Sequence, residues 1–309
     1  MDRSVRNFDT IKSYTDILGV ECSHPLVCVV NLNLARKMYH MMHTNSFYSL
    51  YLKDEKNCSI TYGRRDYDYS EGSVVALAPG QVIGMHDNGE KFQPKGWALF
   101  FHPDLLKGTE LGHCMKEYSF FKYKVNEALH LSEDERAQFL SLLEQTDAEI
   151  RSFSDDRARR TICSYIHILL DHCLRFYERQ FSTRRDESLD ILSKFEDILF
   201  HYYDHDAESL PTVKWCADQL CLSPNYLGDL MKKETGMNAK DQIHGHILFE
   251  VKARLEGSAD SVSAISEQLG FQYPQHLTRF FKSMTGMTPM EYRNSLMKPD
   301  KKTKKTAYE

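Results

Sequence analysis

The chain has 309 residues, of which 41% are hydrophobic and 27% charged, a composition typical of a globular protein with room for two domains. The absence of any run of about 18 apolar residues excludes a membrane-spanning helix. The formal net charge is −5, but residues 211–309 carry 14 Lys and Arg against 11 Asp and Glu, whereas residues 1–210 carry 25 against 33, so only the C-terminal part has the sign that a nucleic-acid partner requires.

The N-terminus and the cysteines indicate a cytoplasmic protein. Met1, Asp2 and Arg3 open a polar segment without the apolar region of a signal peptide. The eight cysteines are scattered singly, and no pair has the spacing of a zinc or redox motif. Reduced thiols in a cytosol are the simplest account, so we expect no metal site and no membrane partner.

The N-terminal part of the chain is predicted to be rich in β-strands. Residues 1–23 show little pattern beyond one short helix. Short strand-like runs then follow, separated by glycines, at residues 26–31, 46–52, 59–62, 73–77 and 97–101. Six or more strands at about ten-residue spacing predict a small β-barrel or jelly roll.

Two helical segments follow the strands. Residues 132–153 open with Ser-Glu-Asp-Glu, a sequence that caps the start of a helix. Residues 155–181 carry a wide apolar stripe at helical spacing, which can pack on the barrel. The stripe contains Ile162, Ile166, Leu169, Leu170 and Cys173. The polar stretch at 182–187, STRRDE, is predicted to be a linker.

Residues 211–294 contain the same pattern twice, about 50 positions apart. The first copy, TVKWCADQLCLSPNYLGDLMKKETGM, starts at Thr212, and the second, SVSAISEQLGFQYPQHLTRFFKSMTGM, starts at Ser261. In each copy a hydroxyl residue can cap a first helix, a proline (Pro224 or Pro274) can open a second, and a glycine can end it. Each copy is therefore predicted to be a helix–turn–helix, a motif that lays its second helix in the major groove of DNA.

The candidate DNA-contacting residues lie on the outward face of the two predicted second helices. They are Asn225, Tyr226, Gly228, Asp229, Lys232 and Lys233 in the first copy, and Gln275, His276, Thr278, Arg279 and Lys282 in the second. The second set offers an amide, a hydroxyl, a guanidinium and an ammonium, which can read base edges and bind phosphate. In the first set, Gly228 has no side chain and Asp229 is acidic, so this copy reads weakly unless a cytosine amine donates to Asp229. Ordinary solvated polar residues would also account for any one of these positions.

The doubled unit resembles the DNA-binding domain of AraC/XylS-type transcription regulators over about residues 189–296. The resemblance rests on WCADQLCLSPNYL, KKETGM, ISEQLGF and LTRFFKSMTGMTPMEYR, in that order. It implies two helix–turn–helix units joined by one long helix, here at about 239–255, that contact neighbouring major-groove segments of double-stranded DNA. It also implies a homodimer whose interface includes the apolar stripe at 162–173, and RNA polymerase as a partner if the protein is an activator.

The stretch YGRRDYDYSEGSVVALAPGQV, followed by GWALFFHPDLL, resembles more loosely the cupin-like sensor domain found in many such regulators. This implies a small-molecule effector, although no pocket residues can be assigned. Metal cupins carry a His-x-His pair and a following Glu, which residues 86–90 lack. His244 and His246 do read His-x-His, but positions i and i+2 of a helix diverge. We find no nucleophile elbow and no phosphate-binding loop, so we expect no enzyme activity, no cofactor and no metal.

The sequence therefore predicts an α+β protein with a cupin-like β-barrel sensor at 1–131, a helical dimerisation element at 132–181, a linker at 182–187, an all-α double helix–turn–helix domain at 188–296 and a basic disordered tail at 297–309. The predicted function is that of a sequence-specific, effector-controlled transcription regulator. One alternative is the same regulator with an N-terminal domain used only for dimerisation or partner docking. The other is a cupin enzyme fused to a DNA tether.

Overall fold

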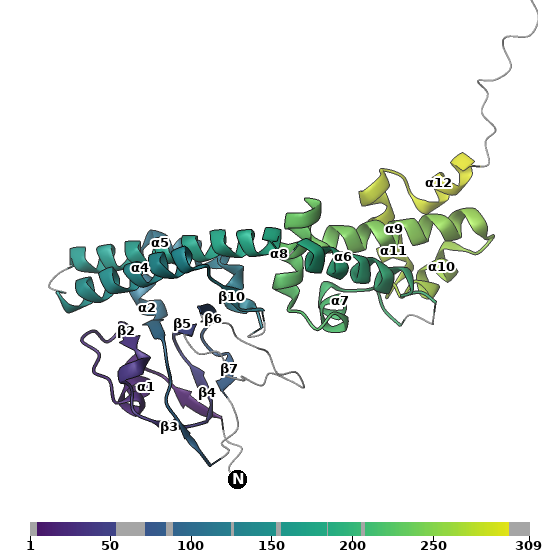
Figure 1. Cartoon of the computed structure of the whole chain (residues 1–309). Coiled ribbons are helices and arrows are strands. Elements are labelled where there is room, and N and C mark those ends of the chain that lie inside the picture. Colours follow the sequence, from purple (N-terminus) through teal and green to yellow (C-terminus); the bar gives the residue numbers. More distant parts are fainter. Residues whose placement is uncertain are drawn as a thin grey trace, which may run out of the picture. The chain divides into compact units, whose positions relative to one another are not determined.

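The computed structural model describes residues 5–53, 72–84, 89–124, 127–152, 156–183, 185–204 and 208–296. The chain divides into two compact units, Met1–Arg185 (unit 1) and Asp186–Glu309 (unit 2). Unit 1 combines strands and helices, whereas all the described elements of unit 2 are helices (Figure 1).

The strands in the described part of unit 1 form three sheets. A five-stranded antiparallel sheet has the order β10-β6-β5-β9-β2, a three-stranded sheet has the order β1-β4-β7, and β3 pairs with β8. The strands are β1 Arg6–Phe8, β2 Val27–Asn31, β3 Met38–Tyr39, β4 Met42–Asn45, β5 Tyr48–Lys53, β6 Ser73–Leu77, β7 Val82–Gly84, β8 Lys91–Phe92, β9 Trp97–Phe101 and β10 Leu129–His130.

The predicted strands at 26–31, 46–52, 73–77 and 97–101 correspond to β2, β5, β6 and β9, and the run at 59–62 lies outside the described residues. Within the described ranges the strands do not close into a barrel, because β1, β4 and β7 pair with one another and not with the five-stranded sheet. A closed cupin-like barrel is therefore not confirmed.

Glycine permits a close approach of two strands of the five-stranded sheet. Gly96, just before β9, has φ +100°, and a Cβ placed on it would lie 2.0 Å from the carbonyl oxygen of Leu52 on β5. A side chain at this position would force the two strands apart, so the sheet depends on glycine here.

The helices of unit 1 include two long ones that lie side by side, α4 Glu133–Arg151 and α5 Asp156–Thr183 (Figure 1). As predicted, Ser132 caps α4 in a reciprocal capping box with Glu135. The shorter helices are α1 Ile11–Leu18, α2 Pro103–Leu106 and α3 Glu110–Cys114, with 3₁₀ turns at Leu32–Leu34, Met115–Glu117 and Ser119–Lys122.

The apolar stripe of α5 packs in the interior of unit 1. Ile162, Ile166, Leu169 and Leu170 are 0% exposed and Cys173 is 1% exposed, and α5 contacts α2, α3, α4 and β10. A side chain without exposed surface has no area to offer a second chain, so the burial of these five residues favours packing within unit 1, and the dimer interface stays a prediction. The helical periodicity correctly showed that this face is covered, but periodicity does not show what covers it.

Unit 2 consists of seven described helices. They are α6 Arg185–Phe200, α7 Val213–Gln219, α8 Pro224–Thr235, α9 Ala239–Gly257, α10 Val262–Gln268, α11 Pro274–Thr285 and α12 Pro289–Leu296. A capping box opens α12, because Thr288 and Glu291 exchange hydrogen bonds. The hydrogen bonds that Thr288 donates to the Glu291 carboxylate also lower the pKa of Glu291.

Helix α9 is the central helix of unit 2. It buries one residue in every four along its length, since Ala239, Ile243, Ile247, Val251 and Leu255 are each at most 2% exposed. All of α7, α8, α10, α11 and α12 contact α9. The joining helix predicted at 239–255 is thus present and carries both copies of the repeat.

The second copy also touches the chain that precedes the first. Gly270, in the turn between α10 and α11, has φ +77°, and a Cβ placed on it would lie 2.5–2.7 Å from the backbone of Ser209. The corresponding residue of the first copy, Cys221, also has a positive φ of 60° but is exposed. The shared left-handed turn therefore tolerates a side chain in the first copy and excludes one in the second.

The stretch 182–187, which was predicted to be a linker, is largely helical. Ser182 and Thr183 belong to the end of α5, and α6 begins at Arg185, so helix flanks position 184 on both sides. A polar sequence indicates exposure to solvent, but it does not by itself end a helix. The division between the two units, at 185/186, falls inside the 182–187 stretch.

None of the helices in the described ranges is both long and apolar enough to cross a membrane. The predicted basic tail at 297–309 lies outside these ranges.

Candidate nucleic-acid interface

Both copies of the repeat form the predicted helix–turn–helix, α7–α8 and α10–α11. The side chains of Thr212 and Ser261 accept hydrogen bonds from backbone N–H groups of the first helices, and Ser223 does the same for α8. Gly236 and Gly286, with φ +75° and +79°, end the second helices in the left-handed conformation.

The apolar sides of α8 and α11 anchor these helices in unit 2. Leu227, Leu230, Met231, Leu277 and Phe281 are each at most 1% exposed. Phe280 is only half-buried, and its ring makes a T-shaped contact with His244 on α9 at 5.5 Å between centroids. With these faces fixed, the opposite faces of α8 and α11 are held in place.

Helix α11 exposes most of its predicted reading stripe. Gln275, His276, Arg279 and Lys282 are all exposed. Thr278 is half-buried, and its hydroxyl donates to the carbonyl one turn earlier at 3.1 Å, so it can only accept from a base. The structure therefore brings an amide, an imidazole, a guanidinium and an ammonium together on one exposed helix face.

Helix α8 offers less of its outward face. Asn225, Tyr226, Gly228 and Asp229 are half-buried, whereas Lys232 and Lys233 are exposed. A Cβ at Gly228 would meet no atom within 4 Å, so packing does not require glycine there. Its two exposed side chains are cations suited to phosphate rather than to base edges.

Tyr273 is a further candidate that the sequence analysis missed. It stands directly before α11, is 52% exposed, and contacts the ring of His276 edge to face at 5.3 Å. It occupies the place of the capping Ser223 in the first copy, and it makes no side-chain capping bond. An exposed aromatic in place of an expected cap is the sequence signal that could have found it.

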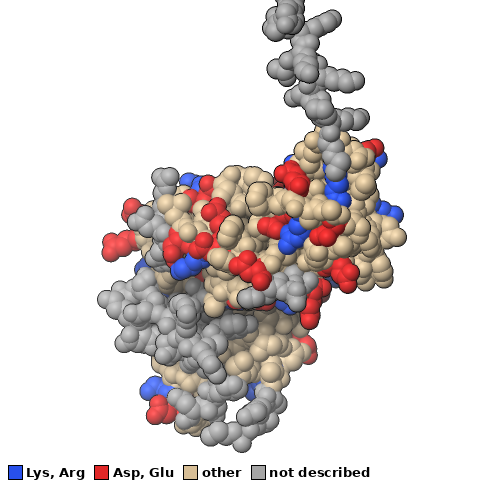
Figure 2. All heavy atoms as spheres, turned by 90° about the vertical axis from the view of Figure 1, so that its right-hand side faces the viewer, with Lys and Arg blue, Asp and Glu red and all other residues tan. Residues whose placement is uncertain are grey.

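The cations of this surface are local rather than part of a broad basic field. Lys232 and Lys233 lie in the last turn of α8, and Lys282 lies in the last turn of α11, where the helix dipole favours them. Attraction to phosphate would come from these lysines and from the exposed Arg279 of α11. On the one face of the molecule that Figure 2 shows, acidic and basic side chains are intermixed.

The His-x-His sequence on α9 does not form a metal site. His244 contacts the ring of Phe280, whereas His246 stacks on Tyr203 at 6.1 Å, so the two imidazoles face different neighbours. Across the part of the chain that the structure describes, no group of three or more His, Cys, Asp or Glu side chains is arranged to hold a metal ion. Of the segment 86–90, which lacks the metal-cupin pattern, only residues 89 and 90 lie inside this part.

Comparison with known proteins identifies the class of the helical domain. Residues 216–295 match the family model described as "Helix-turn-helix domain". The chain is 38% identical over 88 residues to the uncharacterized transcriptional regulatory protein YesN of Bacillus subtilis, which is 26% of this chain and 23% of YesN. It is 26% identical over 101 residues to the arabinose operon regulatory protein of Salmonella typhimurium, which is 33% of this chain and 36% of that protein.

Among solved structures, the C-terminal domain of the response regulator YesN from Fusobacterium nucleatum is 26% identical, with a TM-score of 0.30, over 32% of this chain and 93% of that domain. The chain thus spans well under two thirds of the length of the two curated relatives. The helix–turn–helix pair of this protein is an AraC-type DNA-binding domain.

Proposed function

We propose that the protein is a sequence-specific DNA-binding transcription regulator in which α11 reads bases and α8 mainly holds phosphate. The observation that carries this proposal is the exposed stripe of Gln275, His276, Arg279 and Lys282 on a helix whose other side is anchored by the buried Leu277 and Phe281. The names of both relatives, as regulatory proteins, support it.

The roles of Arg279 and Lys282 can be separated by experiment. The guanidinium of Arg279 suits the O6 and N7 acceptors of guanine, a contact worth about 1–3 kcal/mol. Arg279→Ala should therefore weaken specific binding by about tenfold or more and relax preference at one base pair. Lys282→Ala should weaken binding to all sequences alike and make the salt slope shallower by about one.

The measurement begins with selection of a binding sequence for the full-length protein from random duplexes. Binding to single-base variants of this sequence is then measured at two salt concentrations. Lys194→Ala, which removes an exposed cation of α6, is the matched control. It should change neither the base preference nor the salt dependence of binding. A uniform loss of affinity in Arg279→Ala, with an unchanged base profile, would make Arg279 a phosphate contact and refute the assignment.

Asp229 and Tyr273 take secondary roles in this proposal. Removal of the carboxylate in Asp229→Asn should raise general affinity and blur specificity, because a carboxylate near phosphate is unfavourable unless a base amine donates to it. The hydroxyl of Tyr273 can donate to a phosphate at the start of α11, so Tyr273→Phe should weaken binding without a change of base preference.

We also propose that unit 1 controls the regulator through a small-molecule effector. Both ring nitrogens of His43 and the side-chain oxygen of Asn45, on β4, are buried, and none of the three has a well-formed hydrogen-bond partner among the described residues. Such groups are rare in folded proteins, and water or a ligand is the usual partner. A neutral molecule with both a donor and an acceptor would satisfy them.

A thermal-shift screen of neutral metabolites tests the effector proposal, because a ligand of the native state raises its stability by about 2.7 kcal/mol at 100 times Kd. A hit should be lost in Asn45→Leu. If saturating concentrations of a broad library leave the melting of unit 1 unchanged, an N-terminal domain without an effector, used for docking or dimerisation, becomes the better account.

The assembly and domain boundaries are further parts of the proposal. We propose a cytoplasmic homodimer that contacts RNA polymerase if it activates transcription. We place the domain boundaries near residues 131, 181 and 188, and the division of the chain into two units at 185/186 supports the last boundary. Limited proteolysis near 182–187 should release a C-terminal fragment that still binds DNA at low salt. Sedimentation of the full chain decides between monomer and dimer.

A further inference from the structure

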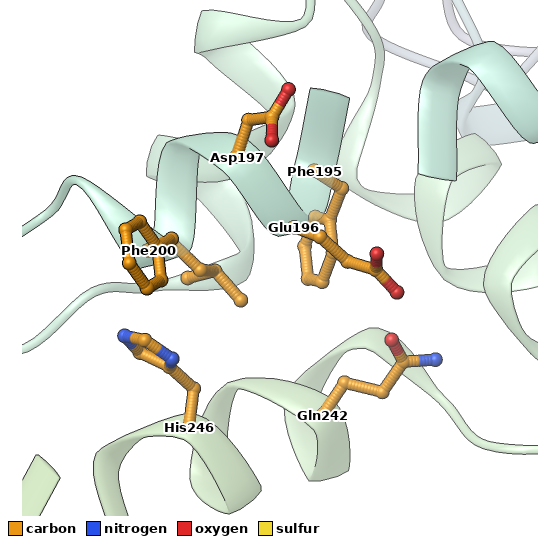
Figure 3. A pocket seen from close by; sticks show the side chains of 7 residues that line it. Phe195, Glu196, Asp197, Phe200, Gln242 and His246 are labelled. Carbon is orange, nitrogen blue, oxygen red and sulfur yellow. The ribbon is translucent and has the colours of Figure 1, made fainter. Parts of the chain in front are cut away.

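Unit 2 contains a groove between helices α6 and α9. The groove has a volume of about 370 Å³ and is lined by Phe195, Glu196, Asp197, Leu199, Phe200, Gln242 and His246 (Figure 3). The buried side chains of Phe195 and Leu199, which are 1% and 4% exposed, form the apolar floor of the groove. Glu196 and Gln242 approach one end of the groove, and Phe200 faces His246 at the other (Figure 3).

This face of α9 is only partly covered: Gln242 donates to the Thr235 hydroxyl at the end of α8 at 2.6 Å, and Gln242 and His246 are half-buried. Gln242, His246 and Phe249 lie at positions i, i+4 and i+7 of α9 and therefore form one stripe along the helix. At 3.6 residues per turn, this stripe lies roughly 130° around the helix from the middle of the buried stripe. Phe249 is 62% exposed, and Phe200 on α6 is 67% exposed. Phe200 lines the groove, and Phe249 continues the α9 stripe about one turn beyond His246. An exposed aromatic side chain at an apolar groove, with a second one along the same helix stripe, is typical of a binding surface.

The charges around the groove are of one sign. Glu196 and Asp197 are exposed, and neither has an ion-pair partner among the described residues. The groove has no Lys or Arg in its lining, and burial lowers the pKa of His246, which keeps the imidazole neutral near pH 7. The two carboxylates repel phosphate, so this face does not suit DNA and instead favours a cationic partner.

We propose that the α6/α9 groove is a docking site for an amphipathic helix of a partner protein, with an apolar ridge flanked by Lys or Arg. A helix that enters a groove places its anchors at i, i+3, i+4 and i+7, a span of about 10 Å at 1.5 Å per residue, which is also the span of α9 from Gln242 to Phe249. The apolar ridge would cover Phe195, Leu199, Phe200 and Phe249, and the cations would pair with Glu196 and Asp197. This interaction goes beyond DNA binding and leaves the exposed stripe of α11 free.

The test uses the full-length protein and three fluorescein-labelled 18-residue peptides. The first has Leu and Phe at i, i+3, i+4 and i+7 with Lys at the flanking positions, the second has Glu in place of each Lys, and the third is a scramble of the first. We expect the first peptide to raise fluorescence anisotropy with a micromolar Kd and the other two to bind at least tenfold more weakly.

Variants locate the site on the protein. Phe249→Ser should weaken the first peptide about tenfold, as loss of an aromatic anchor does. Glu196→Gln should weaken it about threefold, the scale of an exposed ion pair. The matched controls are Met290→Ser, which removes an apolar side chain that is 49% exposed on α12, and Glu267→Gln, which removes an exposed carboxylate of α10; neither should change Kd.

Three results would overturn the proposal. The first is equal binding of the Lys and Glu peptides, which would remove the argument from charge. The second is equal loss of binding in the groove variants and their controls, which would place the peptide elsewhere. The third is a wild-type dimer in sedimentation that Phe249→Ser converts to a monomer, because the groove would then join two copies of this chain. None of these assays contains DNA, so they fail or succeed independently of the proposed DNA reading.

Discussion

The buried histidine of unit 1 should make this unit sensitive to acid. His43 is 6% exposed, its ring stacks on Tyr14 at 5.2 Å, and it meets the edge of Phe8 at 5.6 Å. Burial lowers its pKa from 6.5 to about 4, although the nearby Met41 backbone opposes the shift. In the folded protein the imidazole is therefore neutral throughout the range in which the unfolded chain takes up a proton.

The size of the effect follows from this difference in pKa. The contribution of the neutral His43 to the free energy of unfolding is complete above pH 6.5. It is lost as the pH falls from 6.5 to about 4, because in this window only the unfolded state binds the proton. Each pH unit is worth about 1.36 kcal/mol, so unit 1 should lose about 2 kcal/mol by pH 5 and about 3 kcal/mol by pH 4 from this residue. In His43→Phe that part of the pH dependence should be absent.

The two tryptophans allow unit 1 to be followed alone. Trp97 lies on β9 and Trp215 on α7, so a Trp215→Phe background leaves one reporter, in unit 1. Urea unfolding followed by Trp97 fluorescence between pH 4 and 7.5 gives the free energy of unfolding at each pH. His113→Phe, which replaces an exposed histidine of α3, is the matched control. Equal pH slopes for His43→Phe and the control would refute the reasoning.

Other substitutions should act through backbone and core. Gly245→Ala on α9, where a Cβ would meet no atom within 4 Å, should stabilise unit 2 by about 1 kcal/mol in urea unfolding; destabilisation would show an unseen contact. Gly96→Ala should destabilise unit 1 severely, because its Cβ would lie 2.0 Å from the Leu52 oxygen, and a melting temperature within a degree of wild type would contradict this. Ile166→Asp combined with Leu170→Asp should unfold unit 1 by circular dichroism, whereas folded monomers would restore the stripe as a dimer interface.

The parts of the fold that the sequence predicted correctly depend on local chemistry. The caps at Thr212, Ser223 and Ser261 and the stops at Gly236 and Gly286 each follow from one residue and its immediate neighbours. Repetition of the pattern strengthened the prediction, since the same chemistry recurs about 50 residues later. The joining helix could be predicted because it connects two elements that were already located.

The parts that were missed depend on contacts between distant residues. β1, β3, β4, β7 and β8 have two to four residues each, too few for an alternating pattern, and Arg6 pairs with His43 across 37 positions. Helical periodicity marked the α5 stripe as covered but could not distinguish its own domain from a second chain. The exposure of Phe200 and Phe249 likewise depends on tertiary packing, so nothing in the sequence pattern singled out these two residues.

The contact between Gly270 and the backbone of Ser209 has a consequence for how the DNA-binding part folds. The chain just before the first copy packs against the turn of the second, and α9 buries residues from one end to the other. Neither copy can therefore complete its packing until the other is in place. The duplicated motif should fold as one cooperative unit, with a single unfolding transition, and a chain cut between the copies should leave two unstructured fragments rather than two smaller domains.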